Sequence, residues 1–89
     1  MIRLFMRHPV NDFSRWKKVY EEFEPTRKEM GVKAHGVYQA LDDSNDVTVW
    51  HDFEDIERAR SFVEAPRLKE AMSEAGVAGV PTTWFTRSA

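Results

Sequence analysis

The order in which strand-like and helix-like periodicities follow one another constrains this chain most. Residues 2–8 alternate in a two-residue period, which predicts a strand. Residues 13–30 carry their apolar side chains on one helical stripe, and Asn11 or Asp12 can cap the first turn. Pro25 interrupts that stripe and should kink the helix, because proline removes one backbone hydrogen bond.

The second half of the chain repeats these two patterns. Residues 32–41 and 47–53 predict two strands, and the turn-forming residues 42–46 between them predict an antiparallel hairpin. Residues 55–75 predict a second helical stretch, and Thr82–Thr86 a last strand. The order β-α-β-β-α-β is that of the ferredoxin-like α+β fold. Right-handed crossovers then give a four-stranded antiparallel sheet with both helices on one face.

The two faces of the predicted sheet differ in composition. If Leu41 pairs with Val47 in the hairpin, one face is mainly aliphatic, and we place it against the helices. The opposite, open face carries two tryptophans, a tyrosine and a phenylalanine, which is too much apolar surface to leave in water. Its residues are Arg3, Phe5, Arg7, Ala34, Gly36, Tyr38, Thr48, Trp50, Asp52, Thr82, Trp84 and Thr86.

The size of the chain also argues for a partner. A domain of 89 residues buries a small core, and such domains are usually reinforced by disulfides, a metal or a second subunit. The sequence has no cysteine, which excludes disulfides and thiolate metal sites. We therefore expect residues 1–89 to form one domain that makes a homodimer through its open face. The two sheets would enclose either a packed interface or a ligand cavity.

Charge and hydropathy exclude several kinds of partner. The formal net charge is −2 and no basic face is evident, so we expect no nucleic acid. No apolar run approaches the about 18–20 residues of a membrane span, and the N-terminal segment lacks the features of a signal peptide. We therefore expect a cytoplasmic protein. Neither the glycines nor the three histidines form a cofactor or metal motif, so we expect no cofactor and no metal.

Stretches spread over nearly the whole chain resemble one known group of proteins. These stretches are His8–Trp16, Gly31–His35, Asp46–Val49, Phe53–Phe62, Ala65–Leu68, Glu70–Met72 and Ala75–Val77. Together they resemble the dimeric α+β barrel superfamily, which contains the antibiotic biosynthesis monooxygenase-like domains. Within it they are most similar to a small bacterial subgroup whose members mostly lack an assigned activity.

The resemblance implies a homodimer whose facing sheets form a barrel around a central pocket. Activities of the superfamily include cofactor-independent oxygenation of aromatic polyketides, haem degradation and isomerisation of small cyclic substrates. The haem-degrading members hold iron with a histidine on the second helix, and residues 55–75 here contain no histidine. What the resemblance implies for this chain therefore does not extend to haem degradation.

A few polar and aromatic residues are candidates for a site. His35 is the candidate general base, because a neutral imidazole accepts protons near neutral pH. Arg7 is the candidate clamp for a carboxylate or an enolate-like oxygen. Open-face rings that can stack on a flat ligand are Tyr38, Trp50 and Trp84. The structural alternatives are a hydrogen-bonded histidine, arginine salt bridges between subunits that involve Asp52, and packing of the dimer core.

Two functions stay open at this point. The first is a homodimer that binds or oxidises a small aromatic or polyketide-like molecule, in the manner of a cofactor-independent monooxygenase, with the substrate supplying the electrons. The second is a non-catalytic dimerisation or regulatory ligand-binding module whose aromatic residues form the interface. A pocket of roughly 300 Å³ or more between the sheets would favour the first function, and a packed space would favour the second.

Overall fold

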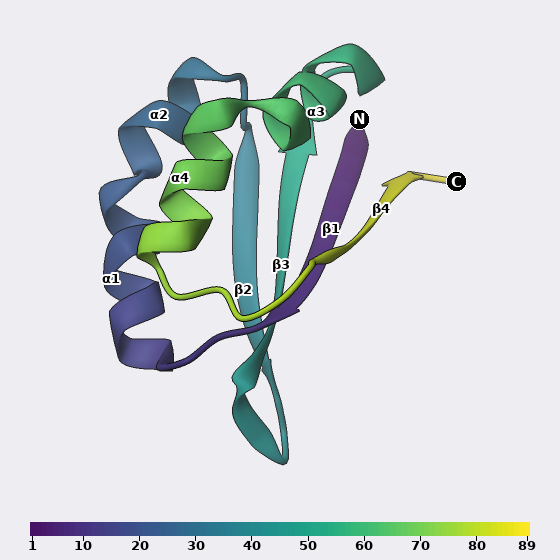
Figure 1. The fold of residues 1–89 in the computed structure, drawn as a ribbon. Helices are drawn as coiled ribbons and strands as arrows, with labels where there is room; N and C mark the ends of the chain where they lie inside the picture. The colour runs from purple at the N-terminus through teal and green to yellow at the C-terminus, as the bar shows by residue number, and fades with distance from the viewer.

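The computed structural model describes residues 1–89 and consists of a four-stranded antiparallel sheet with all its helices on one face (Figure 1). The elements in chain order are β1 (Ile2–Pro9), α1 (Phe13–Glu22), α2 (Glu24–Glu29), β2 (Ala34–Ala40), β3 (Asp43–Phe53), α3 (Ile56–Glu64), α4 (Pro66–Glu74) and β4 (Thr82–Arg87). The strand order β2-β3-β1-β4 is that of the ferredoxin-like topology. The predicted fold class is confirmed.

The helices begin and break close to the predicted positions. The side chain of Asp12 accepts a hydrogen bond from the first turn of α1, so Asp12 is the N-cap. The first predicted helix divides at Phe23 into α1 and α2. Pro25 lies in the first turn of α2, where backbone amides have no hydrogen-bond partner within the helix, so the absence of an N–H group in proline breaks no hydrogen bond there. The second predicted helix divides in the same way at Ala65, before Pro66.

The predicted turn over residues 42–46 is wrong, because most of this segment belongs to β3. Asn45 holds it against the start of α1. Its main-chain oxygen accepts from the amide of Val10 at 2.8 Å, and its side-chain oxygen accepts from the amide of Phe13 at 3.0 Å. Contacts distant in sequence therefore override the local turn preference of these residues.

The predicted pairing of Leu41 with Val47 is also wrong, but the predicted faces are correct. Gln39 lies opposite Val47, the register shifts after Gln39, and Leu41 is fully exposed. The true pairing differs by two residues, and side chains alternate between faces, so the shift returns each residue to the same side. The buried side chains of the helix-facing side are Leu4, Met6, His8, Val47, Val49, His51 and Phe53.

The core lies between this face and the helices. Eleven buried apolar residues form it, and Phe62 of α3 and Trp16 of α1 are its largest contributions from the helices. Two histidines of the sheet share that face with the aliphatic residues. No helix is both long enough and apolar enough to cross a bilayer.

Candidate functional site

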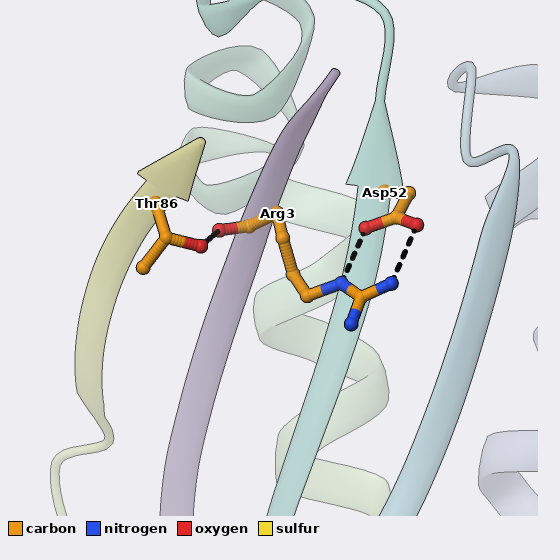
Figure 2. Close-up of polar contacts among 3 residues, drawn as sticks. All are labelled: Arg3, Asp52 and Thr86. Atoms are coloured by element: carbon orange, nitrogen blue, oxygen red, sulfur yellow. Dashed lines mark hydrogen bonds and ion pairs between the residues drawn. The ribbon is translucent and has the colours of Figure 1, made fainter. Parts of the chain in front are cut away.

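Both arginines of the open face are paired with carboxylates of the same chain. The Nε and Nη2 groups of Arg3 donate to the two oxygens of Asp52 at 2.7 and 3.0 Å (Figure 2). The strand register explains this pair, because Arg3 lies directly opposite Asp52. Arg7 donates to Asp46 in the same two-bond geometry, at 3.0 and 2.6 Å. Asp52, expected as a partner across the dimer, is therefore already occupied within one chain.

The aromatic residues of the open face pack in two groups. The guanidinium of Arg3 lies 3.8 Å from the centre of the Trp50 ring. Gly36 lies under the same ring, and a Cβ atom there would come within 2.4 Å of the indole nitrogen, so only glycine allows this packing. Phe5 stacks on Trp84 with ring centres 5.2 Å apart. In a single chain, Trp84 remains 41% exposed and Tyr38 remains 63% exposed.

The predicted site residues are thus distributed over both sides of the sheet. Arg7, Tyr38, Trp50 and Trp84 lie on the open face, whereas His35 lies on the helix-facing side. Arg7 already uses its guanidinium for Asp46. The ligand-binding role of these residues stays a prediction.

A cavity of about 50 Å³ lies on the other side, between the helices and the sheet. Fourteen residues line it and eleven of them are hydrophobic. Its polar lining comes from His8 and His51 of the sheet and from Arg27 of α2. Trp16 and Tyr20 of α1 form an aromatic wall, with their rings stacked 4.9 Å apart. The cavity therefore combines an apolar interior with a few polar groups.

His51 is buried in this cavity without a hydrogen-bond partner. Its surface is 3% exposed, and neither ring nitrogen is paired. Its imidazole lies between the rings of Phe62, at 5.0 Å, and Tyr20, at 6.2 Å. Burial, followed by the charge of Arg27, lowers the pKa of His51 to about 3. The ring is therefore neutral at physiological pH, with one donor and one acceptor unused.

His8 lines the same cavity further along the sheet. It is also 3% exposed, its Nδ1 atom is unpaired, and its ring lies 5.7 Å from that of Trp16. Burial lowers its pKa. His51 lies opposite Leu4, four positions before His8 on β1, so about 13 Å of strand separate the two histidines.

Tyr20 connects the cavity to the predicted base, His35. The Tyr20 hydroxyl lies 2.6 Å from Nδ1 of His35, to which it donates when the ring hydrogen is on Nε2. Burial raises the pKa of Tyr20 to about 12, so the hydroxyl keeps its proton. Burial, followed by the charge of Arg27, lowers the pKa of His35. His35 therefore touches the cavity lining but does not itself line the cavity.

Arg27 is the third polar group of the lining. Only 2% of its surface is exposed, and its Nη1 group donates to the main-chain oxygen of Tyr20 at 2.5 Å. The guanidinium carbon lies 3.9 Å from the centre of the Tyr20 ring. Burial lowers the pKa of Arg27, but a guanidinium stays charged in a protein.

Sequence reasoning placed the apolar side chains of residues 13–30 on one helical stripe and did not single out Arg27. The sequence did contain an indication that Arg27 is buried, because Arg27 continues the apolar stripe of Tyr20 and Phe23 at the next helical step. His51 lies on the sheet face that was predicted to pack against the helices, but the sequence did not single it out as a site residue. Its lack of a partner depends on which side chains the fold brings around it, which periodicity does not describe.

Comparison with known proteins bears on the fold. No protein-family profile matches the chain, and no curated protein matches it. Among solved structures, a provisionally assigned antibiotic biosynthesis monooxygenase from Bordetella bronchiseptica has a TM-score of 0.85 at 12% identity, over 99% of this chain and 96% of its own. SnoaB, a cofactor-independent oxygenase from Streptomyces nogalater, has a TM-score of 0.80 at 12% identity, over 99% and 92%. A conserved protein from Methanosarcina mazei Go1 has a TM-score of 0.77 at 19% identity, over 99% and 92%.

What these proteins share with the chain is the fold. The superpositions cover almost all of each chain, whereas the identities are 12% and 19%. The resemblance inferred from the sequence is therefore confirmed at the level of the fold. Fold alone does not carry an activity, so the function has to be argued from the cavity.

Proposed function

We propose that this chain, which has the fold of the antibiotic biosynthesis monooxygenase-like proteins, binds a small hydroxylated aromatic molecule between its helices and its sheet and oxidises it without a cofactor. The observation that supports this most is His51, whose two buried ring nitrogens lack partners. A buried polar group without a hydrogen bond lowers stability by about 1–3 kcal/mol. A ligand hydroxyl that pairs with His51 would recover that free energy.

The remaining lining favours a flat, apolar ligand body. Trp16 and Tyr20 contribute aromatic rings, and most of the other lining residues are aliphatic. At about 50 Å³, the cavity is smaller than the roughly 300–1,000 Å³ of pockets that enclose larger ligands. A ligand of several rings must therefore displace part of the wall. Met6 and Met72 lie in that wall, and unbranched thioether side chains adapt readily to a new shape.

The proposed oxidation takes place at a ring carbon that carries two hydrogens. One oxygen atom of dioxygen becomes a carbonyl at that carbon, and the other leaves as water with both hydrogens, so the substrate supplies the electrons. His51 orients the ligand hydroxyl, and the apolar wall excludes bulk water. Tyr20 can take up a proton from the ligand while it passes its own proton to Nδ1 of His35. In this proposal His35 keeps its predicted role as the base.

Binding of naphthol tests the first half of this proposal. The chain has three histidines, so imidazole NMR signals report on the cavity with little overlap. Naphthol should shift the signals of His8 and His51, and calorimetry should show weaker binding to His51→Leu. Trp50→Phe changes an open-face ring and serves as the matched control that retains binding. Perturbation at Trp50 in place of His51 would move the ligand to the open face and contradict the cavity site.

Oxygen consumption tests the second half. Dithranol, a hydroxylated anthrone with a ring carbon that carries two hydrogens, is the probe. The native protein should speed the uptake of dioxygen, and His51→Leu should slow it. Naphthol binding without any acceleration of dithranol oxidation would rule out the oxygenase and leave the ligand-binding module.

We also propose that the chain forms a homodimer through its open face. Exposed Trp84 and Tyr38 lie there, and burial of aromatic surface is the usual driving force for association. Arg3 and Arg7 are neutralised by Asp52 and by Asp46, so this face can be buried without leaving isolated charges.

A further inference from the structure

We infer that the ligand proposed above carries a carboxylate and that Arg27 binds it. This inference rests on the proposed function and names the chemical class of the ligand. The class is a hydroxylated aromatic acid, with its ring in the cavity, its hydroxyl at His51 and its carboxylate at Arg27.

Arg27 is a buried cation without an acidic partner. Only 2% of the surface of Arg27 is exposed, and Arg27 takes part in none of the seven ion pairs of the chain. Its Nε atom is buried and has no hydrogen-bond partner. Transfer of a charge out of water is strongly unfavourable unless the charge is paired. The fold thus keeps at the cavity a positive charge that forms no ion pair with any carboxylate of the chain.

Contacts within the chain satisfy only part of the hydrogen-bonding capacity of this guanidinium and do not neutralise its charge. Its Nη1 group pairs with a carbonyl of Tyr20 near the end of α1, and its plane covers the Tyr20 ring. Neither contact brings a negative charge. A planar guanidinium offers its N–H groups in pairs that match the two oxygens of a carboxylate.

A surface hollow of about 320 Å³ adjoins Arg27 between α2 and the start of β2. Its lining contains three cations, Arg27, Lys28 and Lys33, and one acid, Glu24. Lys28 lies 3.9 Å from Glu24, whereas Arg27 and Lys33 take part in no ion pair of the chain. Arg27 lines both this hollow and the apolar cavity, and it therefore stands where a charged end and an apolar body of one ligand would meet.

Arg27 and His51 are close enough to be reached by one flat molecule. Both lie against the ring of Tyr20, the guanidinium at 3.9 Å and the imidazole at 6.2 Å. The charge of Arg27 is also one of the causes that lower the pKa of His51. A ring that carries a hydroxyl and a carboxylate on different carbons can place one group at each residue.

His35 lines the hollow and gives an independent readout of the charge there. Burial lowers its pKa first, and the charges of Arg27, Lys17 and Lys28 lower it further, against an opposite effect of Glu24. A carboxylate bound at Arg27 would offset these positive charges and raise the pKa of His35. A neutral amide at the same place would not.

The test compares hydroxynaphthoate with hydroxynaphthamide on the full native chain, with naphthol as the reference ligand. Calorimetry should show that the acid binds at least about tenfold more tightly than the amide, because a charge-assisted pair replaces a neutral contact. Added salt should reduce that preference. NMR titration should show that only the acid raises the pKa of His35.

Two variants assign the preference to Arg27. Arg27→Gln removes the guanidinium and should make the acid and the amide bind equally. Lys18→Gln removes the same charge from an exposed position of α1 and is the matched control, which should keep the preference. Circular dichroism checks the folding of both variants. If Arg27→Gln does not fold, two measurements on the native chain test the inference. These are the difference in affinity between hydroxynaphthoate and hydroxynaphthamide and the titration of His35, and equal affinities with an unchanged pKa of His35 would overturn it.

The outcomes separate this inference from the proposed function. If naphthol binds but the acid and the amide bind equally, the inference is overturned and the proposed function stands. If naphthol does not bind at all, the proposed function itself fails. A preference for the acid that survives in a folded Arg27→Gln variant would assign the carboxylate to another cation and overturn the role of Arg27.

Discussion

Replacement of His51 by leucine should remove a large part of the acid sensitivity of this protein. In the folded chain burial lowers the pKa of His51 from 6.5 to about 3, whereas the unfolded chain exposes the ring to water. Below the unfolded pKa, the unfolded state binds a proton that the folded state does not bind. The contribution of His51 to stability is therefore complete above 6.5 and falls as the pH decreases toward 3.

The size of this effect follows from the width of that interval. Each pH unit between the two pKa values lowers the free energy of unfolding by about 1.4 kcal/mol. Between about pH 7.5 and about pH 5 the His51 contribution amounts to about 2 kcal/mol. Leucine does not titrate, so the variant should lack this loss. At neutral pH the variant should be no less stable than the native chain, because leucine leaves no buried nitrogen unpaired.

Urea unfolding at the two pH values measures this difference. His8, His35 and the carboxylates titrate in both proteins, so the comparison of His51→Leu with the native chain isolates His51. Val49→Ala, on the same buried face, is the control: it should lower stability at both pH values and keep the native pH dependence. An identical acid loss in His51→Leu and in the native chain would refute the conclusion that the fold holds this ring neutral.

Two further predictions concern the open face. Sedimentation at micromolar concentration should give about twice the 10.4 kDa chain mass. Trp50→Asp should dissociate the dimer, because it places an unpaired charge in the interface. A dimer mass that is unchanged in this variant would contradict the open-face interface. Gly36→Ala should lower the free energy of unfolding by about 1–3 kcal/mol through overpacking, since its Cβ would come within 2.4 Å of the Trp50 indole nitrogen; a variant of native stability would show that Trp50 can move freely.

The assignment of the two sheet faces shows what local sequence patterns can predict. The alternation of residues 2–8 predicted which side of β1 packs against the helices, and the structure buries Leu4 and Met6 there. The prediction survived an incorrect hairpin register, because a shift of two residues returns a side chain to the same face. Periodicity is therefore a robust source of topology and of faces.

The hairpin shows where local patterns fail. Residues 42–46 have strong turn preferences, yet Asn45 joins β3 because its main chain and side chain bind the segment that leads into α1. These partners are distant in sequence, and no local propensity reports them. The same limitation applies to Arg27, which looks like an ordinary helix cation until its burial is known.

The sequence by itself determined the element order, the four-stranded sheet with helices on one face, and the aromatic, arginine-bearing open face, because each follows from periodicities of a few residues. Only the tertiary structure decided that Asp52 and Asp46 neutralise the open-face arginines within one chain, and that a cavity lies on the opposite side. It also decided that His51 and Arg27 meet around Tyr20 without partners for all their polar atoms. The physical reason is that burial and hydrogen bonding depend on side chains from α1, α2, α3 and the sheet at once, and their mutual distances are set by packing rather than by position in the sequence.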